Sequence, residues 1–235
     1  MITLIIATGN AHKVEEICGI LGANFQFLTL RDFPEAPAVI EDANSFAGNS
    51  TKKAVELARW LASQPATFNL QLSTAFILAD DSGLEVDALH GAPGIHSARF
   101  AALGTGAEGN SSDAENNAKL LRLLRDVPEE KRAARFRCVL ALTPVLHETV
   151  GTTSPVCAAD EGELRTELFE GACEGRIALV PGGAKGFGYD PFFIPDGFNQ
   201  SFAELGEEVK NRISHRARAL EKLRAWFHAG AERPI

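Results

Sequence analysis

The distribution of apolar and polar residues at the start of the chain predicts a strand, a loop and a helix. Residues 2–7 are an apolar run, and the polar stretch 8–10 follows them. Beyond it, apolar side chains recur at the spacing of one helix face: Val14, Ile17, Cys18, Ile20 and Leu21. Asn10 is a suitable N-cap and Gly22 a suitable helix end. A helix that begins just beyond a strand offers N–H groups to an anion, whereas Lys13 in its first turn opposes the macrodipole unless an anion binds there.

A second helix is predicted around residues 46–61, with Asn44 or Ser45 as its cap. Its inner face would consist of Phe46, Ala54, Leu57, Ala58 and Leu61. Lys53 lies on this helix and Glu41 lies just before its first turn. A helix end that presents a carboxylate and a lysine can hold a metal and a phosphate together. The alternative is an ordinary solvated face.

A short apolar run over residues 74–79 leads into two adjacent carboxylates, Asp80 and Asp81, and then into the pair 82–83, Ser-Gly. This pattern predicts a buried strand that ends at the carboxylates, and ligands of open α/β sheets bind at such carboxyl ends. The alternation over residues 84–89 predicts a second short strand. The alternative for the acidic pair is a simple turn, since Asp and Gly are common turn residues.

Several later segments also have readable patterns. The turn at residues 91–94 can present Ser97 and Arg99 to a ligand. Residues 164–180 predict one or two strands around turns at Gly171 and Gly175, whereas residues 143–165 have little pattern. Further elements are predicted as a helix over 113–124 and a strand over 134–142.

A glycine-rich aromatic stretch follows. Glycines on both sides of Phe187 allow the backbone to approach a planar ligand closely, and the ring can stack on it. Asp190 can accept hydrogen bonds from ring N–H groups. A nucleobase or a sugar fits this description, and so does an aromatic core loop.

The last predicted helix opens with the segment from Lys210 to Arg216, capped by Ser214. Its basic residues, His215 and Arg216, would lie at the N-terminal end, which is unfavourable for the macrodipole but suits an electron-rich ligand.

Composition narrows the functional classes. The chain has 235 residues, of which 45% are hydrophobic, enough for one large core or one core with a subsidiary lobe. A net charge of -8 argues against nonspecific binding to nucleic acid or to an anionic membrane. No apolar window has the length of a membrane helix, and the apolar start lacks the basic flank of a signal peptide. The four cysteines form no C-x-x-C pair, so we expect thiols in the cytoplasm, with no zinc site or disulfide framework.

Six blocks of sequence, in this order, resemble the Ham1/RdgB family of inosine and xanthosine triphosphate pyrophosphatases. They are Thr8-Gly9-Asn10-x-x-Lys13-x-x-Glu16, Glu41 with Ser45-Phe46-x-x-Asn49-x-x-x-Lys53-Ala54, Ala79-Asp80-Asp81-Ser82-Gly83-Leu84, Gly91-x-Pro93-Gly94-x-x-Ser97-Ala98-Arg99, Gly186-Phe187-Gly188-Tyr189-Asp190-Pro191-x-Phe193 and Ile213-Ser214-His215-Arg216. They extend over essentially the whole chain.

The resemblance implies one catalytic domain over residues 1–235, of class α/β, with an elongated mixed β-sheet, flanking helices and two lobes around a central active-site cleft. It implies a homodimer that uses Mg²⁺ to convert dITP, ITP and XTP to the monophosphate and pyrophosphate, a reaction that cleanses the nucleotide pool.

The resemblance also implies roles for individual residues. Those for the triphosphate are Thr8, Gly9, Asn10, Ala11, His12, Lys13, Lys53 and Ser82. Those for the metal are Glu41 with Asp80 or Asp81, since adjacent residues of a strand point to opposite faces, and Asp81 is also the general base. Those for the base and sugar are Phe187, Gly188, Tyr189, Asp190, Lys210, His215 and Arg216, which would read the 6-oxo group of the purine.

The departures from the family pattern are small: Ser50 replaces an expected Ala, and segments 62–74 and 143–165 are long. Two other functions remain open from the sequence. One is a Maf-like nucleotide pyrophosphatase with a different substrate range, and the other is a nucleotide-binding sensor without catalysis.

Overall fold

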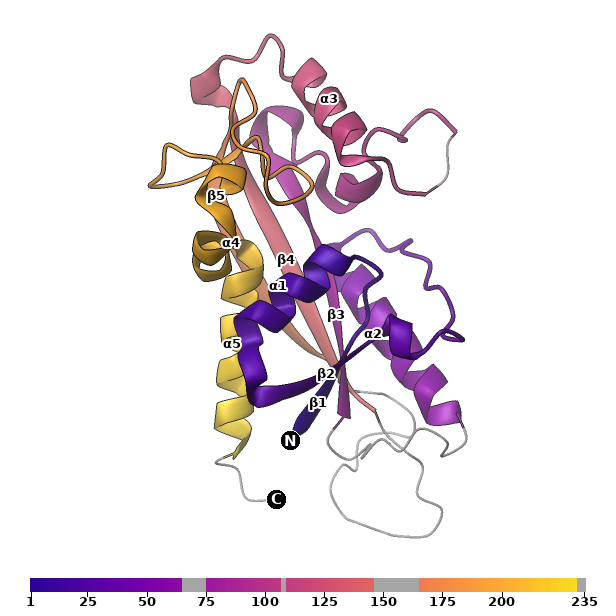
Figure 1. The fold of residues 1–235 in the computed structure, drawn as a ribbon. Coiled ribbons are helices and arrows are strands. Elements are labelled where there is room, and N and C mark those ends of the chain that lie inside the picture. The colour runs from indigo at the N-terminus through magenta and orange to yellow at the C-terminus, as the bar shows by residue number, and fades with distance from the viewer. Residues whose placement is uncertain (65–74, 107–108, 146–164, 232–235) are drawn as a thin grey trace, which may run out of the picture. The chain divides into compact units, whose positions relative to one another are not determined.

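The computed structural model describes residues 1–64, 75–106, 109–145 and 165–231. The strands are β1 Ile2–Ile6, β2 Phe25–Thr29, β3 Ala75–Val86, β4 Ala133–Pro144, β5 Glu167–Ile177 and β6 Phe193–Pro195 (Figure 1). The α-helices are α1 Ala11–Leu21, α2 Phe46–Ser63, α3 Asp113–Leu123, α4 Phe202–Ile213 and α5 His215–Ala231. Within the described residues the strands form one six-stranded sheet in the order β2-β1-β3-β4-β5-β6.

The chain divides into two compact units. Unit 1 comprises Met1–Asp80 and Leu140–Leu168, and unit 2 comprises Asp81–Val139 and Phe169–Ile235. The boundary within β3 therefore falls between the two adjacent carboxylates that the sequence singles out.

Unit 1 begins with the predicted strand, loop and helix. β1 pairs in parallel with both β2 and β3, with Ile2 opposite Phe25 and Thr3 opposite Ala75. All five residues predicted for the inner face of α2 are buried. Four of them, all except Phe46, belong to an apolar core that comprises Ile5, Ala7, Phe33, Ala54, Leu57, Ala58, Leu61, Ala75, Ile77, Ala79, Ala141 and Val145. This core packs α2 against β1 and β3.

Unit 2 has an aromatic core. The rings of Phe136, Phe193 and Phe202 lie with centroids 4.7 to 6.2 Å apart. β5 pairs antiparallel with β6, with Gly175 opposite Pro195. Because the sheet contains parallel and antiparallel pairs and helices accompany it, the predicted class, an α/β protein with a mixed sheet and flanking helices, is confirmed.

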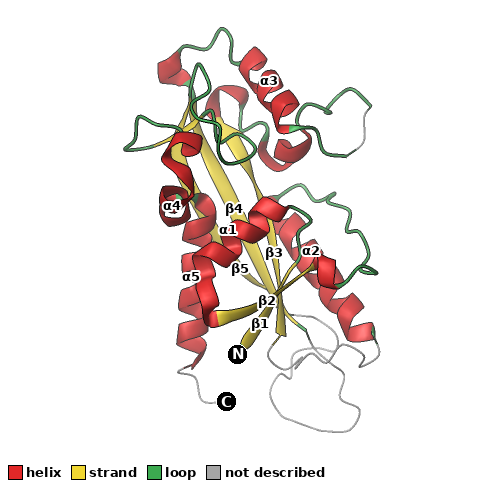
Figure 2. Cartoon of the chain, viewed as in Figure 1, coloured by secondary structure: helices red, strands yellow, loops and turns green. Residues whose placement is uncertain are grey.

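One prediction about the acidic pair is wrong: β3 does not end at Asp80 and Asp81. The strand is 12 residues long and continues past them to Val86 (Figure 2). Residues 87–89 form a 3₁₀ turn rather than part of a second strand. Leu84 and Val86 are fully buried, so burial of these apolar side chains outweighs the turn preference of the Asp-Asp-Ser-Gly sequence.

The predicted turns at Gly171 and Gly175 are also wrong, because both residues lie inside β5. A Cβ at Gly171 would collide with the backbone carbonyl oxygen of His215, and one at Gly175 with that of Ile194. These glycines therefore allow close approach of neighbouring backbone rather than a change of chain direction.

The final helical region differs from the prediction in one respect. Lys210 lies in the last turn of α4, where a cation is favourable for the macrodipole, and not at the start of a helix. Ser214 separates the two helices and caps α5 as predicted, since its Oγ accepts the Ala217 N–H at 3.1 Å. The long segments noted in the sequence lie mostly outside the described residues, at 65–74 and 146–164.

Candidate active site

The loop between β1 and α1 is held by its own side chains. Asn10 Oδ1 accepts the Lys13 N–H at 3.2 Å, which confirms the predicted N-cap. Thr8 Oγ1 accepts the Asn10 N–H at 3.2 Å. Gly9, Asn10, Ala11 and His12 are exposed, so this helix end is accessible to a ligand. This arrangement of an exposed loop and a helix N-terminus suits an anion.

The cation in the first turn of α1 has a partner within the protein. Lys13 Nζ lies 2.6 Å from Asp80 Oδ1, and the side chains are 14% and 0% exposed, respectively. The carboxylate offsets the unfavourable position of the lysine at a helix N-terminus. The pair also compensates a carboxylate that is completely removed from solvent.

A second lysine approaches the same aspartate from α2. Lys53 Nζ donates to the Asp80 backbone oxygen at 2.8 Å and lies 3.3 Å from Glu41 Oε1. The segment that carries Glu41 is tied to the helix, because the Ala43 N–H donates to the buried Asn49 side chain at 3.0 Å. Unit 1 thus brings together four residues that the sequence assigned to phosphate or metal, namely Lys13, Glu41, Lys53 and Asp80.

The neighbouring positions of β3 belong to unit 2. Asp81 is 6% exposed. Ser82 Oγ accepts a hydrogen bond from Arg216 Nη2 at 3.0 Å, and the Arg216 side chain is buried. Asp81 and Ser82 are therefore both in unit 2, together with residues that the sequence assigned to the base.

In the glycine-rich loop, Asp190 binds other residues of the chain. Its Oδ2 accepts the Phe187 N–H at 3.0 Å and lies 2.5 Å from Lys210 Nζ. Lys210 Nζ also lies 4.4 Å from the centroid of the Phe187 ring, within the range of a cation–π interaction. Gly186 has a φ of 78°, and a Cβ there would collide with the Asp190 carboxylate. The loop sequence is thus required by packing as well as by any ligand.

His215 stacks on Phe136, with centroids 4.8 Å apart and an interplanar angle of 15°. Sequence reasoning missed Phe136, which it placed only within a strand. It also expected Ser97 to face a ligand, and this is wrong. The Ser97 hydroxyl is a structural group that donates to the Gly94 oxygen at 2.6 Å and accepts the Leu84 N–H at 2.9 Å.

Two further residues escaped notice in the sequence, Asp113 and Asn117 of α3. Both bond to the backbone of Gly188, at 2.6 and 2.8 Å. Their spacing of four on a predicted helix was the available signal, but nothing in the sequence showed which segment they would contact.

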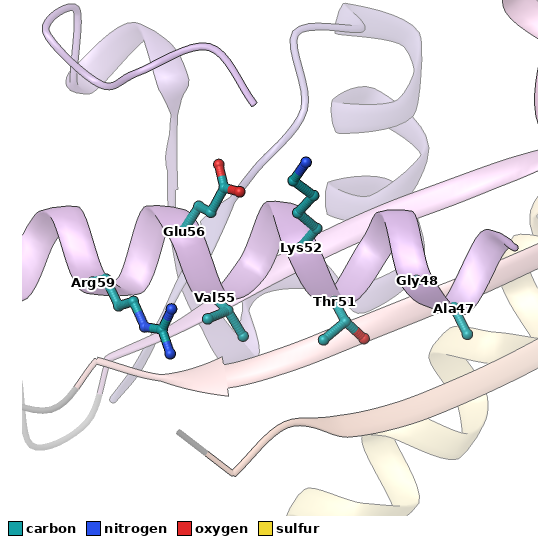
Figure 3. A pocket seen from close by; sticks show the side chains of 7 residues that line it. All are labelled: Ala47, Gly48, Thr51, Lys52, Val55, Glu56 and Arg59. Carbon is teal, nitrogen blue, oxygen red and sulfur yellow. The ribbon is translucent and has the colours of Figure 1, made fainter. Parts of the chain in front are cut away.

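The outer side of α2 lines a separate pocket of about 440 Å³ (Figure 3). Its lining residues are Ala47, Gly48, Thr51, Lys52, Val55, Glu56 and Arg59. They occupy helix positions complementary to the buried ones, and none of the site residues predicted from the sequence lines it. Lys52 is held by Asp42 at 2.7 Å.

The described part of the chain contains no group of three His, Cys, Asp or Glu side chains placed to hold a metal by themselves. Among the helices described, none is long and apolar enough to cross a membrane.

Comparison with known proteins decides the family. The model of the Ham1 family matches residues 4–226. The chain belongs to the Ham1 family. A dITP/XTP pyrophosphatase of Opitutus terrae is 43% identical over 228 residues, which cover 94% of this chain and 96% of that protein. The dITP/XTP pyrophosphatase of Desulforamulus reducens is 43% identical over 220 residues, which cover 93% of this chain and 92% of that protein.

Solved structures of the Ham1 family agree with this fold. The Ham1 protein of Staphylococcus aureus has a TM-score of 0.73 at 30% identity, covering 97% of this chain and 99% of that one. A Ham1 protein from Coxiella burnetii has a TM-score of 0.72 at 32% identity, and the match covers 97% of this chain and 100% of that one. The Ser at position 50, unexpected from the family pattern, is fully buried and donates to the Ala47 oxygen at 3.1 Å, so its hydroxyl is satisfied within the helix.

Proposed function

We propose that the chain hydrolyses noncanonical purine nucleoside triphosphates, namely dITP, ITP and XTP, to the nucleoside monophosphate and pyrophosphate. Relatives that are 43% identical over almost their full length are dITP/XTP pyrophosphatases. The chain's own residues explain how it could bind the phosphates, activate a water molecule and bind the base.

The observation that carries the proposal is the fixation of Lys13 and Lys53 around Asp80. Both ammonium groups are held within 2.8 Å of an oxygen of this residue, and both side chains are largely buried. In a chain with a net charge of -8, two buried cations beside an exposed helix N-terminus depart from the general acidity. Fixed cations and backbone N–H groups are the usual means of binding a polyphosphate and of stabilising charge as a P–O bond breaks.

In the proposed reaction, Asp81 accepts a proton from a water molecule that attacks the α-phosphorus. The bond from the α-phosphorus to the bridging oxygen breaks, and pyrophosphate leaves with that oxygen. Lys13 and Lys53 offset the negative charge that grows on the phosphate oxygens. Because Asp81 is only 6% exposed, its interactions are less screened than those of a surface carboxylate.

We propose Mg²⁺ as the cofactor, held by Glu41 and by Asp80 or Asp81 together with substrate phosphates. Carboxylate oxygens are donors that Mg²⁺ prefers, and it commonly takes one or two of them plus phosphates in place of an all-protein cage. When bound, the ion would neutralise phosphate charge.

The base would be bound by Phe187 and its neighbours, with Lys210, His215 and Arg216 as donors. Donors favour the 6-oxo acceptor of hypoxanthine and xanthine over the 6-amino group of adenine, because two donors repel each other. The buried cations Lys210 and Arg216 support this preference.

We further propose a cytoplasmic homodimer. The thiols of Cys18, Cys138 and Cys173, which are not in disulfides, suit a reducing compartment. The dimer rests on the family resemblance. Sedimentation velocity at micromolar concentration tests it, and a monomer under those conditions would contradict it.

The decisive experiment for activity is turnover of dITP, ITP, XTP, GTP and ATP with Mg²⁺, with pyrophosphate and orthophosphate measured separately. We expect pyrophosphate as the product and kcat/KM for dITP at least about 100-fold above that for ATP, as hydrogen-bonded discrimination allows. Equal turnover of ATP, or release of orthophosphate alone, would reject the proposal. Asp81→Asn should abolish turnover while nucleotide binding is largely kept.

A further inference from the structure

Two side chains of α3 grip a single residue of the glycine-rich loop. Asp113 Oδ2 accepts the Gly188 N–H at 2.6 Å, and Asn117 Nδ2 donates to the Gly188 oxygen at 2.8 Å. Asp113 and Asn117 are four positions apart, so they project from the same side of the helix. The backbone donor and the backbone acceptor of Gly188 are thus both bound by one element that lies more than 70 residues away in the sequence.

The Asn117 amide is oriented by this contact. Asn117 is 9% exposed, and its buried Oδ1 has no hydrogen-bond partner within the described part of the chain. Turning the amide over would place Oδ1 against the Gly188 carbonyl oxygen, two acceptors facing each other. An acceptor is therefore left unsatisfied in order to keep the donor on Gly188.

The helix that carries the two side chains is itself well fixed. Ser112 and Glu115 form a capping box at its start. Asn116 accepts the Ala101 N–H at 2.8 Å and donates to the Ala98 oxygen at 3.2 Å. Leu120 is fully buried in the core of unit 2. Groups on such a rigid element can hold a flexible backbone more accurately than groups on another loop.

Gly188 lies between the two aromatic residues of the loop, Phe187 and Tyr189. Gly188 has a φ of 61°, so its neighbours are separated by a left-handed turn that glycine adopts readily. Tyr189 is anchored separately by its hydroxyl, which donates to the Ser97 oxygen at 2.8 Å. The two hydrogen bonds to Gly188 therefore set the direction of the chain at Phe187, and with it the orientation of the ring.

We propose that Asp113 and Asn117 are positioning residues for base binding, which fix the Phe187 ring through the backbone of Gly188. This inference rests on the proposed function, since it assigns the ring to the purine. Neither side chain needs to touch the nucleotide. Their loss should weaken interactions with the base and leave those with phosphate unchanged.

The test uses the isosteric variants Asp113→Asn and Asn117→Asp in the full-length chain. Asp113→Asn replaces the charged carboxylate that accepts the Gly188 N–H with a neutral amide, a weaker acceptor. Asn117→Asp places a carboxylate oxygen against the Gly188 carbonyl oxygen. We expect KM for dITP to rise about tenfold in Asn117→Asp, equivalent to about 1.4 kcal/mol, and less in Asp113→Asn, with kcat within about threefold of wild type. The inhibition constant of inorganic pyrophosphate, which has no base, should not change.

Glu115→Ala is the matched control. It removes part of the capping box of the same helix without touching Gly188, so it should lower the melting temperature and leave KM for dITP unchanged. The positioning role is overturned if all three variants raise KM equally, or if the inhibition constant of pyrophosphate rises with KM.

Failure of the proposed function would be distinguishable from failure of this inference. If wild-type protein does not hydrolyse dITP, the affinities for dIMP and for pyrophosphate, measured by calorimetry, replace KM and the inhibition constant. Weaker dIMP binding in Asn117→Asp with unchanged pyrophosphate binding would support the positioning role even then. Unchanged dIMP binding would reject it.

Discussion

Replacement of Lys13 by Met tests whether the buried ion pair with Asp80 stabilises unit 1. The ammonium group lies 2.6 Å from a carboxylate that is 0% exposed, so its removal leaves a buried charge with less compensation. Removal of one partner of a buried pair typically costs about 3–5 kcal/mol. Lys53 still donates to the Asp80 backbone oxygen, so we expect the lower end, about 3 kcal/mol. For a chain of this size that corresponds to a fall in Tm of roughly 6–12 °C.

The assay is urea denaturation followed by circular dichroism, without nucleotide or metal. The control is Lys52→Met, because Lys52 forms a pair with Asp42 at 2.7 Å on the same scaffold but at an exposed position. This control should lose much less stability, since exposed pairs are screened by water and salt. The double variant Lys13→Met, Asp80→Asn should recover part of the loss, because the uncompensated carboxylate is gone. Equal losses in Lys13→Met and Lys52→Met would refute the reasoning.

Three further predictions concern stability. Gly171→Ala should lower the free energy of unfolding by about 3 kcal/mol or prevent soluble expression, because its Cβ would collide with the His215 backbone. In a thermal melting assay the control Gly9→Ala should be nearly neutral, since no heavy atom lies within 4 Å of the added Cβ. Arg132→Lys should lower the free energy of unfolding, measured by urea denaturation, by about 2–4 kcal/mol. A lysine cannot replace the hydrogen bonds of the buried guanidinium to the Leu124 oxygen at 2.6 Å and the Val127 oxygen at 2.9 Å. A loss as small as that of the exposed variant Arg125→Lys would contradict this. Burial, followed by the nearby Arg99, lowers the pKa of His96, so the neutral form is favoured in the folded state. The stability that neutral His96 contributes is therefore present above the unfolded pKa of about 6.5 and is lost as the pH falls. Between pH 7.5 and 5.5, His96→Gln should lose less stability than wild type. Parallel curves of stability against pH for the two proteins would exclude this contribution.

The sequence predicted local structure well where the signal was local. The cap at Asn10, the helix behind it and the buried face of α2 all follow from residue spacing and capping chemistry, and the structure confirms them. These features depend on neighbours within about one helix turn, which a single sequence contains.

The predictions that failed depend on contacts between distant segments. Ser82 and Gly83 look like a turn, yet β3 runs through them because Leu84 and Val86 are buried beyond. Gly171 looks like a turn until the backbone of α5 is placed against it. Burial by tertiary neighbours overrides local propensity in both places.

α4 was missed for a related reason. Gly206, with a φ of 76°, interrupts the helical pattern before Lys210, so this lysine was assigned to the following helix. The capping box formed by Ser201 and Glu204 was the available signal for the start of α4. The partnership of Lys210 with Asp190, 20 residues away, has no comparable signal in the sequence.

The central claim is attack of water at the α-phosphorus with departure of pyrophosphate. Hydrolysis of dITP in water enriched in heavy oxygen, followed by mass spectrometry of both products, tests it most directly, because attack at the α- or the β-phosphorus gives the same two molecules but labels only one of them. The account predicts one heavy oxygen in dIMP and none in pyrophosphate. Label in pyrophosphate, or in orthophosphate released alongside dIDP, would contradict it.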